Sequence, residues 1–326
     1  MFRLSTSVMY DTSTRGMQDQ QLKLFKTQMQ LSSGQRLVSP ADDPPAAARI
    51  LDLTQAIDNT TQYKKNIAFA RTRLSLEDQT LGGVTNLLQR MRELAVKASN
   101  ATNTTIDRQT IAGEVRQGLG EILGLANTKD GNGDYLFAGF QGQASPAAFT
   151  DDGNGVYTYR GDQGHRTLTI ADNRQMSDGD NGYDLFVNLP TTIDTDPTVN
   201  PGIDPSRSVF GTIYNFAAAL DKITTNANPN PTVGDPLYVG HYITDIDAAM
   251  KRIDDVRTQV GGRLNAIDAQ DQIHDSFNLA AQNARSQDQD LDYVEAISRF
   301  QFSQVALEAA QKTYTQVQGM SLFKYI

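Results

Sequence analysis

The stretch YKKNIAFARTRLSLEDQTLGGVTNLLQRMRELAVKA, residues 63–98, decides the fold of this 326-residue chain. Its apolar residues alternate three and four positions apart from the first residue to the last, and only Glu77 breaks the series. This spacing predicts a long helix that packs side by side with another helix. Gly82 and Gly83 lie inside the stripe without shifting its phase. They are either a tolerated flaw or a place where a neighbouring helix approaches closely.

A proline-rich turn predicts where this helix begins. Asp43 can cap the helix and Pro44 suits the first helical position, so the helix is expected from residue 44 to about residue 98. A polar loop at residues 100–105 leads into a second amphipathic stretch at about 106–127. Because the link is short, we expect the two helices to be antiparallel neighbours.

The C-terminal part of the chain repeats the pattern. Apolar residues again alternate three and four apart from Ile246 to Ile267, with Arg257 as the exception and Gly261-Gly262 as an interruption. A 35-residue stripe runs roughly 50 Å and needs a partner of similar length. The C-terminal stripe is the other segment that long, so the two ends of the chain should form one bundle.

The middle of the chain differs in composition. Residues 130–206 contain twelve Asp and three Arg but no Glu or Lys, and they account for the whole net charge of −9. Short alternating runs at 135–140, 156–160, 166–170 and 183–187 predict four strands. The predicted fold class is mainly α: a long discontinuous N- and C-terminal helical bundle, coiled-coil-like, with an inserted small β-rich domain.

These patterns predict three regions. Residues 1–40 and 286–326 should be terminal polymerisation helices, residues 41–134 and 207–285 the helical bundle domain, and residues 135–206 the inserted surface domain. The outermost segments are polar and Gln-rich, so we expect them to be disordered in the free subunit and to fold on assembly.

Packing, rather than chemistry, is expected to be the role of the large apolar residues in the stripes. The predicted assembly and packing residues are Leu22, Leu24, Phe25, Met29, Leu31, Leu74, Leu81, Leu88, Met91, Ile253, Val260, Leu264, Leu291, Val294, Phe302, Val305, Leu322 and Phe323.

The residues that catalysis would need are missing from the sequence. The chain has no cysteine, which excludes disulfides, thiolate metal sites and a cysteine nucleophile. Its three histidines do not stand at ligand spacing, and neither a G-x-S-x-G elbow nor a phosphate-binding loop occurs. We therefore predict that the protein is not an enzyme, with no catalytic, cofactor-binding or metal-binding residues.

One acidic turn comes close to a calcium loop. Asp130-Gly131-Asn132-Gly133-Asp134 has the first three ligand positions, but Tyr135 and Gln141 stand where a Gly and a bidentate Glu are required. We interpret it as a turn. The acidic chain lacks a basic stripe, which argues against nucleic acid, and no apolar run is long enough to span a membrane.

Four motifs carry a family resemblance. They are Leu31-Ser32-Ser33-Gly34-Gln35-Arg36-Leu37 with Pro40-Ala41-Asp42-Asp43-Pro44, the run at 87–98, Gly133-Asp134-Tyr135-Leu136-Phe137-Ala138-Gly139, and the C-terminal Ser321-Leu322-Phe323-Lys324-Tyr325-Ile326. Together they resemble flagellins and their relatives, and the last two are closer to a hook-associated branch than to filament flagellin.

The resemblance implies a job and a location. Subunits of this family pass through the flagellar type III export channel without a cleaved signal, with an export chaperone on the C-terminal helix. They then self-assemble into a homo-oligomeric ring in the extracellular flagellum. That ring meets a hook-side junction protein and flagellin. The N-terminal segment has no secretory-type apolar core, which agrees with this route.

Two other functions stay open from the sequence. The chain could be a minor filament flagellin, which would share the helical ends. A calcium- or sugar-binding surface protein that uses the Asp-rich middle is the alternative from another class.

Overall fold

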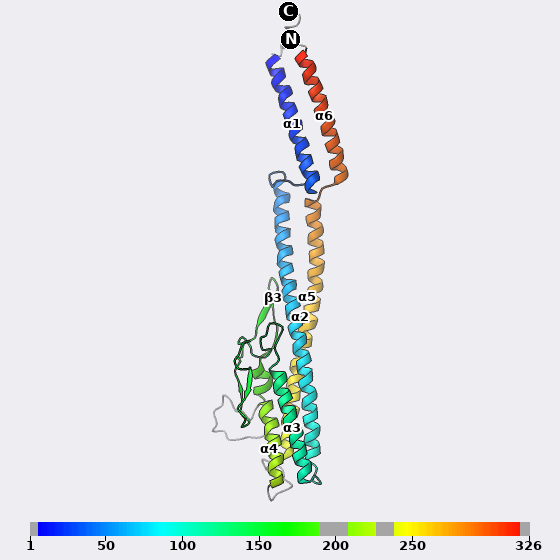
Figure 1. The fold of residues 1–326 in the computed structure, drawn as a ribbon. Coiled ribbons are helices and arrows are strands. Elements are labelled where there is room, and N and C mark those ends of the chain that lie inside the picture. The colour runs from blue at the N-terminus through cyan, green and yellow to red at the C-terminus, as the bar shows by residue number, and fades with distance from the viewer. Residues whose placement is uncertain (1–5, 190–207, 226–237, 320–326) are drawn as a thin grey trace, which may run out of the picture. The chain divides into compact units, whose positions relative to one another are not determined.

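The computed structural model describes residues 6–189, 208–225 and 238–319 (Figure 1). The chain divides into two compact units. One contains residues 1–61 and 274–326, and the other contains residues 62–273. Long helices dominate both units, and the described strands all lie in one short internal segment. The predicted fold class, a mainly α bundle from both ends with a small β-rich insert, is confirmed.

The helix that decides the fold is α2, Pro44–Ala98. Its start is the predicted one, because the Asp43 carboxylate accepts a hydrogen bond from the Ala46 amide at 3.2 Å. Helix α3, Thr105–Ala126, begins with a capping box in which Thr104 and Asp107 satisfy one another's backbone amides. Helix α5, Val239–Gln289, is the long C-terminal partner.

The predicted stripes form the core of the 62–273 unit. The predicted residues of this unit that are fully buried are Leu74, Leu81, Leu88, Met91, Ile253 and Val260. Leu264 is half-buried and packs against the same cluster. Burying one such side chain stabilises the fold by about 1.5–3 kcal/mol, so the stripes are a main source of its stability.

An additional helix, α4 (Val209–Thr225), packs against α3. The sequence predicts helical structure from residue 207 onward but does not separate α4 from α5. Apolar side chains at helical spacing are buried on α4, among them Phe210, Ile213, Phe216, Leu220 and Ile223. Helices α2, α3, α4 and α5 therefore share one apolar core in this unit.

The insert contains two hairpins. Strand β1 (Phe149–Asp151) pairs with β2 (Tyr157–Tyr159), and β3 (Thr167–Ala171) pairs with β4 (Arg174–Ser177), both antiparallel. The predicted strands at 156–160 and 166–170 correspond to β2 and β3. Strands β1 and β4, of three and four residues, were not predicted from the sequence.

Two predicted strands are wrong. Residues 135–140 form a bridge followed by turns, and residues 183–187 form the short π-helix η1, Tyr183–Val187. In both segments consecutive residues are buried, whereas a half-exposed strand buries alternate ones. Their backbone groups bond to loops: the Leu136 amide donates to Thr128, and the Asp184 amide donates to the Asn181 side chain. Both segments are apolar because they are buried, as the sequence indicates, but loops cover them and no strand is formed.

An aromatic cluster joins the insert to α4. The rings of Phe137 and Phe186 meet edge to face with centroids 5.4 Å apart, and Phe149 lies 5.2 Å from Phe210 of α4. All four rings are buried, and aromatic contacts of this kind add about 0.5–1.5 kcal/mol beyond their buried area. The cluster fixes the insert on the helices of its own unit.

The paired glycines of the two stripes differ in their surroundings. A methyl group added at Gly83 would lie 3.2 Å from the Leu125 side chain of α3, so this glycine permits close approach of two helices. An added methyl group at Gly261 or Gly262 would meet nothing within 4 Å. The close-approach interpretation therefore holds for Gly83, and the C-terminal pair is a tolerated flaw.

This difference gives a matched pair of substitutions. Gly262→Ala should raise the free energy of unfolding by about 0.5–1 kcal/mol, because it removes backbone freedom without creating a contact. Gly83→Ala should give a smaller gain or a loss, since Leu125 must move. Urea unfolding of the purified chain measures both, and an equal gain for the two variants would contradict the close approach.

Candidate assembly site

The two terminal helices pack against each other. Helix α1 (Thr6–Ser33) lies beside α6 (Tyr293–Gly319), and both belong to the unit of residues 1–61 and 274–326 (Figure 1). The rings of Tyr10 and Tyr314 meet edge to face, 6.2 Å between centroids, so the helices are antiparallel. The sequence predicts disorder for these segments in the free subunit, whereas the structure shows both as helices.

The face that α6 turns toward α1 is not the predicted stripe. Ala296 is fully buried, and Phe300, Leu307 and Tyr314 are half-buried. Three predicted residues lie elsewhere on the helix: Val294 is 79% exposed, Phe302 is 77% exposed and Val305 is 64% exposed. They make no packing contact within the described structure that would hide them. Their spacings of eight and three place them on one continuous helical face.

The predicted residues of α1 divide in the same way. Leu24, Met29 and Leu31 are half-buried, whereas Leu22 and Phe25 are exposed and three positions apart. Beyond α5, the predicted Leu291 is buried. The predicted Leu322 and Phe323 lie outside the described residues. The terminal unit thus buries a narrow seam and exposes two apolar faces, one on each helix.

A polar clamp closes the same unit near the ends of α1 and α5. Asp288 is its centre: Arg49 donates two hydrogen bonds to the Asp288 carboxylate, both 2.9 Å long. Arg36 donates two more to the Asp288 carbonyl oxygen, at 3.0 and 2.8 Å. Bidentate arginine contacts fix orientation as well as distance. We call Arg36, Arg49 and Asp288 the elbow clamp.

Backbone hydrogen bonds support the elbow clamp. The Arg36 amide donates to the Gln289 carbonyl at 2.8 Å, and the Leu291 amide donates to the Gly34 carbonyl at 3.1 Å. Gly34 has φ of +70°, which favours glycine, and an added methyl group there would lie 2.8 Å from the Tyr293 hydroxyl. The segment that carries the family resemblance therefore holds the junction between α5 and α6.

Neighbouring cations favour the ionised form of two carboxylates in this unit, Asp42 and Asp288. Hydrogen bonds from Arg49 hold the pKa of Asp288 below its usual value, and Lys26 does the same for the pKa of Asp42. A carboxyl group with a lowered pKa stabilises the fold above its unfolded pKa. This stabilisation is lost as the pH falls through the lowered value. The elbow clamp should therefore be secure at neutral pH and weaken in acid.

An apolar groove of about 540 Å³ lies beside the elbow clamp. It is lined by the loop after α1 and the first turns of α2, including Leu37, Val38, Pro40, Ala47 and Leu51. Leu51 and Val38 are exposed large apolar residues. The groove adds to the apolar surface that the terminal unit leaves open.

A buried charge cluster lies in the other unit, where the sequence stripe has its exception. Glu77 of α2 is completely buried, and its Oε1 atom accepts a hydrogen bond from the Asp180 amide at 3.2 Å. Arg263 of α5 donates two hydrogen bonds to the Asp180 carboxylate, at 2.8 and 3.0 Å. Burial raises the pKa of Glu77 well above its usual value; Asp180 raises it further, and Arg263 and Arg73 oppose the shift. Glu77 thus links α2, the insert and α5.

Arg73 extends this cluster into the insert. It is buried, and it donates hydrogen bonds to the Asp130 carboxylate and to the Leu136 carbonyl, the latter at 2.9 Å. Asp178 is completely buried with the Arg166 guanidinium 3.3 Å away, and burial raises the pKa of Asp178. The second stripe exception, Arg257, donates to Asp78 of α2 at 3.1 Å.

In the acidic turn at residues 130–134, the Asp130 carboxylate is already hydrogen-bonded to backbone amides of the turn. Asp130 accepts hydrogen bonds from the amides of Asn132 and Asp134, at 2.9 and 3.1 Å, in addition to the bond from Arg73. Among the described residues, no three His, Cys, Asp or Glu side chains are grouped to hold a metal ion.

The comparisons with known proteins agree with this architecture. Residues 4–142 match the family described as the bacterial flagellin N-terminal helical region. The chain is 30% identical to flagellar hook-associated protein 3 of Salmonella typhimurium over 322 residues. This alignment covers 99% of each protein. The chain belongs to the flagellar hook-associated protein 3 family. It is also 29% identical to the Escherichia coli member, with the same coverage of both chains.

Solved structures show the same fold. A putative flagellar hook-associated protein from Vibrio parahaemolyticus matches with a TM-score of 0.63 and 24% identity, over 76% of this chain and all of that one. The flagellar junction protein FlgL from Legionella pneumophila matches with a TM-score of 0.60 and 20% identity, over 74% of this chain and 100% of the other.

Membership of the hook-associated protein 3 family makes this chain a structural component of the bacterial flagellum and not an enzyme. The family resemblance inferred from the motifs is thereby confirmed. In the described part of the chain, no helix has the length and apolar character that crossing a membrane requires.

In the buried charge cluster, we expect one substitution to stabilise the fold rather than destabilise it. Glu77→Gln should raise the free energy of unfolding at neutral pH by on the order of 1 kcal/mol, because it removes a buried charge and keeps the acceptor for the Asp180 amide. The raised pKa means that Glu77 favours the fold below its unfolded pKa and loses this effect as the pH rises. The gain should therefore shrink toward acid pH, as measured by urea unfolding at several pH values.

A second substitution in the cluster serves as the control. Asp130→Asn should destabilise the fold by about 3 kcal/mol, since it removes the closer of the two carboxylates that face buried Arg73 and leaves only Asp178, 4.0 Å away. If Glu77→Gln destabilised the chain as strongly as Asp130→Asn does, Glu77 would be a needed anion and the interpretation would be wrong.

The elbow clamp gives a separate prediction. Asp288→Asn should loosen the unit of residues 1–61 and 274–326 without unfolding the other unit, because Arg49 loses its bidentate partner. Hydrogen exchange should become faster at the amides of Arg36 and Leu291. Asp52→Asn, an exposed aspartate on α2, is the matched control and should leave both amides unchanged. Equal exchange in the two variants would show that the clamp does not hold the junction.

Proposed function

We propose that this chain joins the flagellar hook to the filament by self-assembly into a ring through its terminal helices. The observation that carries the proposal is the unpartnered apolar face of α6, on which Val294, Phe302 and Val305 are mostly exposed. Monomeric soluble proteins rarely leave a continuous apolar face open, and such faces mark surfaces where another protein binds.

Two further features support assembly through the terminal unit. Leu22 and Phe25 expose a second apolar face on α1, and the apolar groove lies beside the elbow clamp. A groove and protruding apolar faces on the same subunit permit a contact that repeats from copy to copy, which closes into a ring when the rotation between copies allows it.

The proposed partners are those that the family resemblance implies. We propose that one edge of the ring contacts a hook-side junction protein, that the other contacts flagellin, and that an export chaperone covers the C-terminal helix before assembly. The exposed face of α6 is apolar enough to need such a cover in a free subunit. The chain would then act outside the cell, in the extracellular part of the flagellum, after type III export.

The alternative of a minor filament flagellin has weaker support. The chain is 32% identical to flagellin of Clostridium tyrobutyricum, but this match covers 42% of the chain, whereas the hook-associated relatives match over 99%. The middle of the chain therefore distinguishes the two functions. A calcium-binding role has no support from the acidic turn, because its carboxylate is already engaged.

Microscopy of cells that lack the protein tests the junction role. We expect intact hooks without filaments, and flagellin shed into the medium, because the filament would have nothing to attach to. Filaments that are merely shortened would support the minor flagellin instead.

A point substitution tests the surface that carries the proposal. Phe302→Ser should leave the subunit folded, since the side chain is exposed, but should abolish or strongly reduce motility and filament attachment. Phe140→Ser removes an aromatic ring of similar exposure from the insert and is the matched control, expected to swim normally. Normal filaments in the Phe302→Ser strain would contradict assembly through this face of α6.

A further inference from the structure

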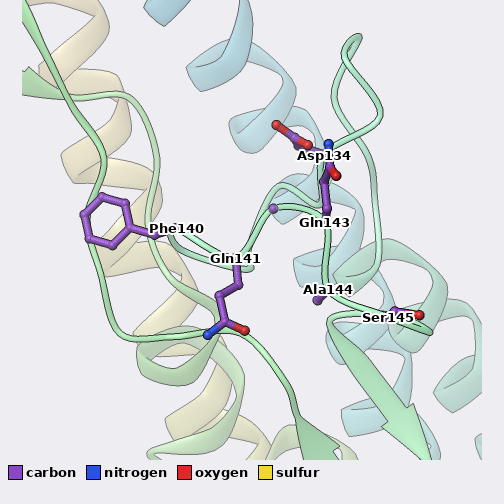
Figure 2. A pocket seen from close by; sticks show the side chains of 7 residues that line it. Asp134, Phe140, Gln141, Gln143, Ala144 and Ser145 are labelled. Atoms are coloured by element: carbon purple, nitrogen blue, oxygen red, sulfur yellow. The ribbon is translucent and has the colours of Figure 1, made fainter.

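The insert carries an open depression that the junction role does not use. Its volume is about 550 Å³, within the range of about 300–1,000 Å³ that is common for small-molecule sites. The lining consists of Asp134 and the loop of residues 140–145. Figure 2 shows these side chains spread along the loop, with Phe140 at one end and Ser145 at the other. Such a layout suits an extended ligand better than a compact one.

The backbone under this depression is held by its own hydrogen bonds. The Tyr135 amide donates to the Gly142 carbonyl at 2.7 Å, and the Ala144 amide donates to the Gln141 carbonyl at 2.9 Å. Gly142 also lets the loop lie close to Asp134, because an added methyl group would clash with the Asp134 side chain. The loop is therefore ordered, and its side chains are left for contacts with a ligand.

Phe140 is an exposed aromatic ring in a fixed position. Its amide donates to the Asp162 carboxylate at 2.9 Å, and the same Asp162 oxygen accepts the Gly164 amide at 2.8 Å. The ring rests against Gly164, where an added methyl group would clash with it. The residue is nevertheless 66% exposed. An aromatic ring that is fixed in position and exposed to solvent can stack against the C–H groups of an aliphatic ring.

The polar side chains of the depression are available. Within the described part of the chain, the side chains of Asp134, Gln141, Gln143 and Ser145 take part in no hydrogen bond or ion pair. The two amides and the hydroxyl can each donate and accept, and the carboxylate accepts. Neighbouring hydroxyl groups of a ligand need this mixture of donors and acceptors.

The composition of the lining argues against anionic ligands and divalent cations. The lining has no Lys, Arg or His, so it offers no charged donor to a phosphate or sulfate. One carboxylate is too few for a calcium or magnesium site. Asp134 and the adjacent Asp162 would also repel an anionic ligand. The lining fits a neutral ligand that is rich in hydroxyl groups.

We propose that this depression binds a neutral oligosaccharide. One sugar ring lies on Phe140, and the hydroxyl groups of the following units exchange hydrogen bonds with Gln141, Gln143, Asp134 and Ser145. Because the depression is open to solvent, we expect weak binding by a single subunit. The proposal does not depend on the junction role, since it concerns only the insert.

The test uses the purified full chain on an array of defined neutral oligosaccharides, printed beside their sialylated and sulfated counterparts. We expect binding to neutral oligosaccharides and weaker binding to the anionic versions of the same chains. Phe140→Ala, and separately Gln141→Ala with Gln143→Ala, should each lower the signal about fivefold or more. Phe302→Ser, which changes the assembly face, should bind as the unchanged chain does.

Saturation-transfer NMR with the best neutral oligosaccharide in solution gives the second readout, and circular dichroism verifies that each variant is folded. Three results would overturn the proposal: no neutral oligosaccharide bound in either assay, preferential binding of the anionic versions, or full binding by folded Phe140→Ala. Loss of binding in Phe302→Ser alone would place the sugar contact on the helices and would also contradict it.

Discussion

The apolar stripe of α2 must be covered along its length, and the rest of the fold follows from this constraint. A helix of 55 residues has no local partner of comparable length, so the stripe can be buried only by a segment from the far end of the chain. Helix α5, with 51 residues, is that segment. Their association brings both ends of the sequence together and leaves everything between α3 and α4 as an insert. The elbow clamp and the buried charge cluster are consequences of the same pairing, because each ties α2 or its preceding loop to residues of α5.

The two charged residues that interrupt the apolar stripes, Glu77 and Arg257, contact other parts of the fold. Glu77 interrupts the apolar series of α2, yet it contacts the insert at Asp180, which in turn binds Arg263 of α5. Arg257 interrupts the series of α5 and contacts Asp78 across the helix pair. Glu77 is buried, whereas the Arg257–Asp78 pair is half-exposed. A buried charge costs stability but restricts how the parts can fit together, since a shifted register would leave it without a partner. The apolar residues thus supply the stability, and the charged exceptions fix the register.

Helices were predictable from the sequence where one periodic signal extended over many residues. The start of α2 at Pro44 and the buried face from Ile67 to Ala98 both follow from the cap and the spacing. The insert was less predictable, because loops bury consecutive residues such as Leu136 and Phe137 without forming a strand. The elbow clamp was missed for another reason: no pattern in the sequence indicates that Asp288 pairs with Arg49. The exposed face of α6 was found as an apolar stripe, but the sequence could not show that α1 covers a different face.

The distance in sequence between Arg49 and Asp288, 239 residues, has a consequence for how the chain folds. Contacts between distant residues require the loss of much chain entropy before any stabilisation is gained, and they form slowly. Neither unit can complete its core until α5 exists, because each unit contains residues from both sides of the insert. During synthesis, which proceeds from the N-terminus, the chain therefore stays unfolded until nearly all of it has been made. Folding of this subunit is thus a late and nearly simultaneous event, which is compatible with the type III export proposed above.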